Sequence, residues 1–465
     1  MPVPLTMLTL TTVLAVGFAS AHAPPEGPPP AAAQGAATQA SPAGVKAIVE
    51  KLESFGTRHT LSDVESAERG IGAARRWIKA TLEEYAKAGA PNNNMRIEFE
   101  EFDAPPSVPV PEGGTPVRIV NVVAVLPGTM PEAAARAYYV VGHYDSRNAD
   151  AADAKGDAPG ANDNASGVAV VMECARVLAA RGGLDCTVVF LCTAGEEQGL
   201  WGAKYHAETI AAKKPYVIQG VLNNDIVGDP WGPVVEGKPR ETKDRIRLFS
   251  EALPRTAGAE EYARLRSTAG EGDSSSRQLA RLVSEIAVWH DLPVKPTLIF
   301  RQDRFLLGGD HIAFNDAGFP AVRLTEVDET YDRQHANVSE REGRPYGDVA
   351  EFVDAEYLGN VARLNIASLV HLASAPSAPG AVRVVVAELG NDTLLRWSPP
   401  SEPDIAGYEV VWRETTSPVW QHTQNVGNFT EARLPVSKDD VFFGVRAYDK
   451  DGFRSPVVFP AAARE

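Results

Sequence analysis

The chain has 465 residues, more than one hydrophobic core usually supports, so two or more domains are expected. Its hydrophobic fraction of 44% and charged fraction of 23% are typical of a soluble globular protein. The formal net charge of −16 includes no long block of one sign and argues against nucleic acid or an anionic membrane as a partner.

The first 23 residues have the features of an export signal. Residues 5–18 are apolar, and small residues follow at positions 19–23, although no Lys or Arg precedes them. The apolar run is shorter than the roughly 20 residues that span a bilayer, which disfavours the alternative of a membrane anchor. We therefore expect cleavage near Ala21 or Ala23, a secreted or periplasmic protein, and no stable membrane association afterwards.

Two composition changes precede the first expected strands. Residues 24–43 are rich in Pro, Ala and Gly and predict a linker without a packed core. Apolar residues at helical spacing then predict helices over about 44–55 and 62–88. Strand-like runs follow at about 95–103 and 117–126.

From residue 137 onward, short apolar strands alternate with helices. Strands are expected at 137–141, 187–191, 217–222, 297–300 and 321–327, and helices at 165–180, 200–210, 274–289 and 349–373. This alternation predicts an α/β fold with a mixed, largely parallel sheet flanked by helices. We place this domain at residues 44–373.

A Ser/Ala/Pro-rich segment at 374–380 separates this domain from a region with a different pattern. Short strands are expected at 381–389, 392–397, 407–413 and 441–448, and they predict an all-β sandwich over residues 378–465. Trp397 ahead of Ser-Pro-Pro, and the later Tyr408 and Tyr448, resemble a fibronectin type III domain. The resemblance implies a role in attachment to an unknown ligand.

The three cysteines, Cys174, Cys186 and Cys192, are too few for a disulfide scaffold. Cys174 lies in an expected helix and Cys192 at the end of an expected strand, where buried thiols pack as small hydrophobic groups. A bridge from Cys192 to either of the other two cysteines remains open.

Side chains that bind metal ions follow several expected strands. Most come directly after a strand, and one lies in a Gly/Asn-rich turn ahead of a helix. Because ligand sites in open α/β sheets form beyond the carboxyl ends of strands, we expect these side chains to converge at one edge. The candidates are His143, Asp163, Glu196, Glu197, Asp225 and His335.

Charge repulsion indicates that this edge holds cations. Two unit charges about 4 Å apart repel by roughly 4 kcal/mol at an effective dielectric constant of about 20, so four carboxylates in one pocket need neutralisation. Two histidines and three carboxylates suit two metal ions and leave Glu196 as a base. Mixed nitrogen and oxygen ligands fit zinc, with cobalt or manganese as alternatives. Asp145 is close enough to accept the second ring N–H of His143.

Each motif taken singly also has a structural interpretation. Asp163 could cap the helix that follows it, and a Glu-Glu pair is normally a solvated helix start. His206 and His311 compete with His335 as the last ligand. His206 lies within a helix pattern, His311 follows Asp310 at an expected helix start where that aspartate could act as cap, and His59 has no partner in view.

Three segments carry a family resemblance: residues 142–146 (Gly-His-Tyr-Asp-Ser), 160–167 (Gly-Ala-Asn-Asp-Asn-Ala-Ser-Gly) and 195–202 (Gly-Glu-Glu-Gln-Gly-Leu-Trp-Gly). They resemble the zinc exopeptidase family of bacterial secreted leucyl aminopeptidases, with its glutamate carboxypeptidase and glutaminyl cyclase relatives. The likeness covers about residues 45–375. Residues 309–311 match the family's Ser-Asp-His segment with Gly in place of Ser, and Tyr331 lies further from His335 than is usual.

The resemblance implies a role for each candidate and two zinc ions as cofactors. One zinc is held by His143 and Asp225, the other by Glu197 and His335, with Asp163 bridging them and Glu196 as general base. It also implies a cis peptide bond between Asp163 and Asn164.

The sequence thus predicts an exported di-zinc aminopeptidase that acts on peptides through a water activated by Glu196. A glutaminyl cyclase-like transferase with one zinc and a carboxypeptidase are the alternatives within catalysis. An inert binding protein is the alternative from another class, and it is disfavoured because no ligand is missing.

Overall fold

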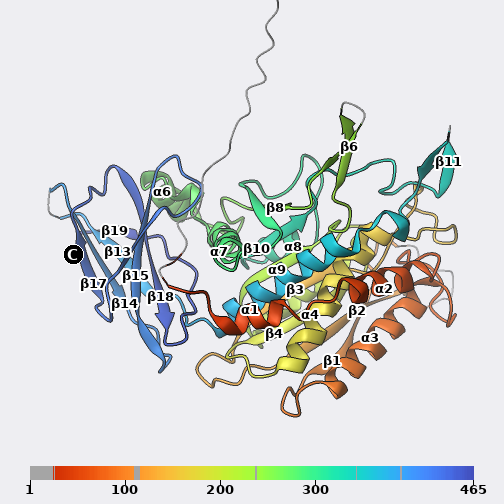
Figure 1. Ribbon diagram of the computed structural model, residues 1–465, viewed down its shortest axis with the longest axis horizontal. Coiled ribbons are helices and arrows are strands. Elements are labelled where there is room, and N and C mark those ends of the chain that lie inside the picture. The colour runs from red at the N-terminus through yellow and green to blue at the C-terminus, as the bar shows by residue number, and fades with distance from the viewer. Residues whose placement is uncertain are drawn as a thin grey trace, which may run out of the picture.

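The computed structural model describes residues 25, 27–108, 116–235, 238–341, 343–387 and 390–464. An α/β domain and a C-terminal β-rich domain pack side by side (Figure 1). The predicted signal peptide, residues 1–23, lies outside the described residues. No helix among those that are described combines the length and apolarity needed to cross a bilayer.

Within the described residues, an eight-stranded sheet in the order β1-β2-β4-β3-β5-β10-β8-β9 forms the centre of the first domain. Its strands are β1 (Arg96–Asp103), β2 (Arg118–Leu126), β3 (Arg136–His143), β4 (Thr187–Thr193), β5 (Val217–Asn224), β8 (Arg245–Ser250), β9 (Lys295–Ile299) and β10 (Ala321–Thr325). The central strands β4, β3, β5 and β10 are parallel, whereas β1, β2 and β8 pair antiparallel with their inner neighbours. The predicted mixed, largely parallel sheet is confirmed.

Helices cover both faces of the sheet, which explains why its central strands are apolar along their whole length. Because successive side chains of a strand point to opposite faces, Tyr138 and Val140 of β3 pack in one core and Tyr139 and Val141 in the other. The first core is covered by α1 (Ala31–Ala37), α2 (Pro42–Glu53), α3 (Gly70–Ala88), α4 (Gly167–Arg181), α7 (Ser275–Trp289) and α9 (Ala355–Ser374). The second is covered by α5 (Trp201–Lys213) and α8 (His311–Asp316).

Side-chain caps set the starts of several helices. The Ser41 hydroxyl accepts the N–H of Gly44 at 3.0 Å ahead of α2, and Asp354 accepts the N–H of Tyr357 at 2.9 Å ahead of α9. Helix α3 begins eight positions later than the predicted helix over 62–88. There the Asp63 carboxylate accepts the N–H groups of Glu65 and Ser66 and holds a turn instead.

The predicted linker at 24–43 is wrong for residues 31–37, which form α1. Ala33, Ala36 and Ala37 are buried in the first core of the α/β domain, where α1 lies against α9 (Figure 1). Alanine side chains are small, so the segment looked too weakly apolar to fold. They nevertheless let a helix approach its neighbour closely.

The stretch 226–273, which lies between the expected strand at 217–222 and the expected helix at 274–289, contains further elements. These are β6 (Trp231–Val235), β7 (Lys238–Glu241), β8 and α6 (Ala259–Ser267). Strand β8 alternates Arg with Ile and Leu, and the charged residues interrupt the apolar run that would have indicated a strand. Strands β6 and β7 pair with each other as a hairpin. Strands β11 (Ser339–Arg341) and β12 (Arg344–Tyr346) form another hairpin, which follows β10.

The C-terminal domain contains two small sheets with mostly antiparallel pairing. The four-stranded sheet has the order β17 (Glu431–Leu434), β14 (Thr393–Ser398), β13 (Gly380–Val385) and β19 (Ala461–Ala463). The three-stranded sheet has the order β16 (His422–Asn425), β15 (Ile405–Glu414) and β18 (Val441–Asp449). Trp397, Tyr408 and Val445 share one core, so the sheets face each other.

Buried ion pairs join the C-terminal domain to the α/β domain. The two oxygens of Asp273 pair with Arg281 of α7 at 2.9 Å and with Arg413 of β15 at 2.8 Å. Arg446 of β18 pairs with Glu285 of α7 at 2.7 Å. These contacts make the second domain a packed neighbour of α7.

The three cysteines are free and buried, as expected for small hydrophobic groups. Burial raises the pKa of Cys186 and of Cys192 to about 12, which makes both thiols unreactive at neutral pH. Neither disulfide that the sequence left open is present.

Candidate active site

The candidate ligands meet at the carboxyl edge of the four central strands. His143 is the last residue of β3, and Asp225 directly follows β5. Glu196 and Glu197 come shortly after β4, and His335 lies in the loop after β10. Asp163 lies in the helical turn η1 (Ala161–Ser166), which leads into α4. The strand-end argument therefore predicted the convergence correctly.

Asp163 lies between two histidine–carboxylate pairs. Its Oδ1 is 3.3 Å from Nε2 of His143, and its Oδ2 is 2.9 Å from Nε2 of His335. His143 Nε2 is also 3.7 Å from Asp225 Oδ1, and His335 Nε2 is 3.1 Å from Glu197 Oε2. Each histidine thus has a carboxylate of its own and shares Asp163. The peptide bond between Asp163 and Asn164 is cis, as the resemblance implied.

The donor atoms fit a pair of metal ions. Among the described residues, the potential ligand atoms of His143, Glu196 and Asp225 lie within 4.8 Å of one another, as do those of Asp163, Glu197 and His335. Glu197 Oε1 is buried without a hydrogen-bond partner in the described part of the chain, and His335 Nε2 faces carboxylate oxygens of Asp163 and Glu197. A buried polar atom without a partner is unfavourable, and a cation beside Glu197 Oε1 would satisfy it.

The charges of the site also fit cations. Burial raises the pKa of Glu196 well above its usual range, and the neighbouring Asp225 and Glu197 carboxylates act in the same direction. Burial and Asp163 likewise raise the pKa of Glu197. These two glutamates thus resist ionisation beside their neighbours, and bound cations would reverse this.

Asp145 holds three parts of the site in place. Its main-chain oxygen lies 3.2 Å from Nδ1 of His143, and its carboxylate Oδ1 lies 3.5 Å from the same atom. The carboxylate accepts the N–H of Glu196 at 3.3 Å and that of Glu197 at 3.2 Å. The expected contact with the His143 ring is thus made mainly through the main chain. A proton on Nδ1 leaves Nε2 free to bind a metal.

Arg147, which the sequence analysis did not single out, contacts the second group of ligands. Its Nε is 2.9 Å from Glu197 Oε2, and its Nη2 is 2.6 Å from Nδ1 of His335. A guanidinium only donates, so this contact requires an unprotonated Nδ1 and places the ring proton on Nε2. Metal binding at Nε2 requires the opposite tautomer. Arg147 therefore has to leave Nδ1 when His335 binds a metal.

Two further residues missed by sequence reasoning support the ligands. Arg323 is fully buried on β10, and its Nη2 lies 3.2 Å from Asp225 Oδ2. Asp348 accepts the N–H groups of Asn162 and Asp163, both at 2.7 Å. An arginine within an apolar strand was a signal for the first. Asp348 lies far from Asp163 in sequence, and no local pattern marks it.

The competing histidines lie outside the site. His311 Nε2 is 2.9 Å from the main-chain oxygen of Gln302, and His206 Nδ1 is 2.9 Å from Glu100. His59 Nε2 is 3.0 Å from the main-chain oxygen of Ala151. Asp310 makes no side-chain cap to α8, contrary to expectation, and instead accepts the Thr193 hydroxyl. Of the four histidines compared, His335 is the one brought to the ligands.

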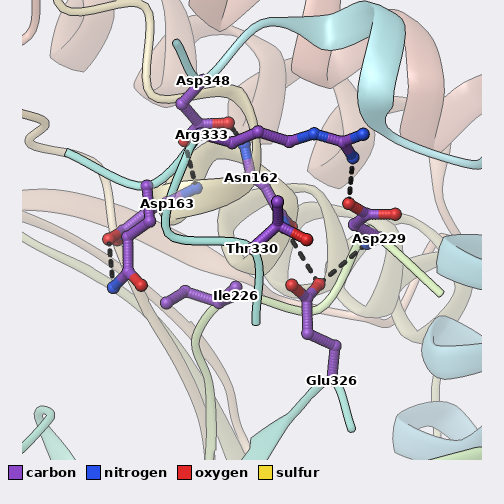
Figure 2. A pocket seen from close by; sticks show the side chains of 9 residues that line it. Asn162, Asp163, Ile226, Asp229, Glu326, Thr330, Arg333 and Asp348 are labelled. Atoms are coloured by element: carbon purple, nitrogen blue, oxygen red, sulfur yellow. Dashed lines mark hydrogen bonds and ion pairs between the residues drawn. The ribbon is translucent and has the colours of Figure 1, made fainter. Parts of the chain in front are cut away.

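Two cavities adjoin Asp163. An open cleft of about 290 Å³ is lined by the ligands and Glu196, with Leu200, Leu306 and Leu307 on its walls. A second cavity of about 10 Å³, shown in Figure 2, has room for roughly one water molecule, and most of the residues around it are polar. The cleft is the part of the site that a substrate can reach.

The mixed sheet and the ligands at its carboxyl edge define the zinc-exopeptidase fold class. The chain belongs to peptidase family M28, whose family model matches residues 121–353. The match includes every candidate ligand, Glu196 and Asp145.

Similar proteins agree with this assignment. A probable zinc metalloprotease of Leptosphaeria maculans is 43% identical over 420 residues, covering 90% of this chain and 94% of that protein. Among solved structures, LapB of Legionella pneumophila has a TM-score of 0.50 at 18% identity, covering 73% of this chain and 74% of that chain. The LapA aminopeptidase of the same organism has a TM-score of 0.50 at 17% identity, covering 74% and 75%. These structural likenesses bear on the fold alone.

Proposed function

We propose that this peptidase is an exported aminopeptidase that uses two zinc ions to remove N-terminal residues from peptides. The observation that carries the proposal is the position of Asp163, with one carboxylate oxygen toward each of two histidines. A single-zinc transferase of the glutaminyl cyclase type would not need both histidine–carboxylate pairs. The naming of the Leptosphaeria relative as a zinc metalloprotease supports the choice of metal.

The ligands divide between the two ions by proximity. His143 and Asp225 would hold one zinc, Glu197 and His335 the other, and Asp163 would contribute an oxygen to each. When bound, such a pair polarises a substrate carbonyl and lowers the pKa of water. Asp145, Arg323 and Asp348 keep the ligand side chains and the main chain of η1 in position.

Glu196 is the proposed general base. It lines the cleft beside His143, and its main-chain N–H is held by Asp145. Its buried carboxylate has a raised pKa, which suits a group that accepts a proton from the attacking water and then donates it to the leaving amine. The Glu196 carboxylate also lies within 4.8 Å of the potential ligand atoms of His143 and Asp225. That Glu196 acts as a base and does not bind the metal is therefore part of the proposal.

The direction of cleavage is tested with blocked peptides. The purified protein is incubated with one peptide in free, N-acetylated and C-amidated forms, with and without a chelator, and products are identified by mass. Stepwise loss from the free amino end, blocked by acetylation and by the chelator, is expected. Cleavage that amidation blocks instead would identify a carboxypeptidase, and cyclisation of N-terminal glutamine a transferase.

Export and the fibronectin type III likeness form the remaining part of the proposal. The apolar segment 5–18 and the small residues after it support export. The two facing sheets and their Trp397 core are compatible with a fibronectin-type module that attaches the enzyme to an unknown ligand. A mature N-terminus after Ala21 or Ala23 in the exported protein is expected, and an intracellular protein with its original N-terminus would refute export.

A further inference from the structure

His335 is held less firmly by the fold than the other candidate ligands. Its side chain is 28% exposed, whereas that of His143 is 2% exposed and that of Asp163 is 5% exposed. It lies between β10 and β11, outside regular structure, and has a left-handed backbone with φ of 53°. A ligand on such a loop needs an anchor to keep one position.

Arg333, two residues before His335, links this loop to Asp229, which lines the small cavity beside Asp163. Its Nη1 pairs with Oδ2 of Asp229, whose side chain is 1% exposed. The guanidinium also lies over the ring of Phe352, 3.8 Å from its centroid. Figure 2 shows Arg333 extended across the small cavity toward Asp229.

The same anchor is connected to Asp163. The N–H of Asp229 donates to Glu326 Oε2 at 2.8 Å, and this oxygen also accepts Nδ2 of Asn162 at 2.9 Å (Figure 2). Asn162 directly precedes Asp163. The chain segments that carry His335 and Asp163, two of the three ligands proposed for the second metal position, are therefore connected through one buried pair of carboxylates, Asp229 and Glu326.

We propose that the Asp229–Arg333 ion pair, braced by Glu326, is the positioning device that fixes His335 at the second metal position. The inference rests on the proposed two-metal function. Arginine suits this role because its planar guanidinium can pair with a carboxylate and stack on a ring at the same time. A lysine at position 333 keeps the charge but loses the stacking plane.

The test is a zinc titration of the full chain in chelator-buffered metal. In Arg333→Met, the affinity of the His335-side zinc should fall about 10–100-fold, as is typical when a group that orients a metal ligand is removed. The affinity of the other zinc should stay within about twofold. Arg333→Lys should lose affinity to an intermediate degree.

A double variant separates positioning from general destabilisation. His335→Ala marks the second binding step, and adding Arg333→Met to it should weaken zinc binding no further, because the anchored side chain is gone. A further loss in the double variant would show that Arg333 acts elsewhere and would overturn the proposal. If Arg333→Met does not fold, Asp229→Asn provides the same measurement with a closer shape.

Arg240→Met is the matched control. Arg240 pairs with Asp328 of the same loop, but its side chain is 49% exposed and it does not reach the ligands. Its loss should leave both zinc affinities unchanged. Wild-type affinity for both ions in Arg333→Met, with two ions bound to the unmodified chain, would refute the positioning role. Fewer than two ions on the unmodified chain would instead refute the proposed function.

Discussion

Glu196 and Glu197 are adjacent in sequence but have different surroundings at the site. Glu197 is tied to Arg147 and lies beside His335, whereas Glu196 faces the cleft next to His143. Asp145 holds the main-chain N–H of both. In the proposed mechanism, the short turn after β4 presents Glu197 as a metal ligand and Glu196 as a base.

Replacing Glu196 with Gln tests this division. The amide keeps the size of the side chain but cannot accept a proton, so kcat should fall about 10²–10⁴-fold, the usual contribution of a general base. Zinc content should stay near that of the unmodified protein. Loss of a bound zinc in Glu196→Gln would show instead that Glu196 is a ligand.

Arg147 competes with metal at His335, because its donated hydrogen bond requires the tautomer that cannot bind through Nε2. Arg147→Gln should therefore raise the zinc affinity of the His335 side, by about tenfold, or about 1.4 kcal/mol. The same chelator-buffered titration measures this change. Weaker zinc binding in the variant would mean that Arg147 supports the ligands rather than opposing the metal.

At the scale of elements, the sequence predicted the convergence of the candidate ligands better than it predicted the residues and loops that support them. Ligands directly at strand ends could be found because the periodicity of β3, β4 and β5 is clear and parallel strands end at one edge. Asp348 and Arg147 could not, because each acts through contacts with residues far away in the chain. His335 was placed correctly, but its anchor through Asp229 depends on a loop conformation that no local pattern specifies.

Helix α1 lies where the sequence predicts a linker, and its buried face can be tested by substitution. Ala33 of α1 is fully buried in the first core of the α/β domain, whereas Ala32 beside it is exposed. Ala33→Glu should lower the free energy of unfolding by at least about 2 kcal/mol because it buries an unpaired charge, and Ala32→Glu should change it by less than about 0.5 kcal/mol. Denaturant titration measures both, and equal values would restore the linker interpretation.

At the scale of the whole molecule, the two domains meet through buried ion pairs and through His371, a histidine that burial keeps neutral. Burial lowers the pKa of His371 on α9 to about 3 and that of His290 at the end of α7 to about 4. His371 Nε2 lies 3.1 Å from both the main-chain N and the main-chain O of Arg454 in the C-terminal domain. A charged His371 ring would therefore disfavour this contact between the domains.

This burial predicts acid sensitivity. Below the unfolded-state pKa of about 6.5, the unfolded chain takes up protons that the folded histidines refuse, so stability present at pH 7 is lost as pH falls. Each histidine contributes up to about 1.4 kcal/mol per pH unit, down to its folded pKa. Denaturation of the metal-free protein at pH 7 and pH 5 measures the loss. The loss should be smaller in His371→Gln, and an equal loss would exclude His371 as a source.

The proposed metal centre requires two cations flanking Asp163, and anomalous diffraction from zinc-loaded crystals tests this directly. Two peaks of similar height are predicted, one beside His143 and Asp225 and the other beside Glu197 and His335, with Asp163 between them. A single peak, or zinc bound away from Asp163, would contradict the proposed centre.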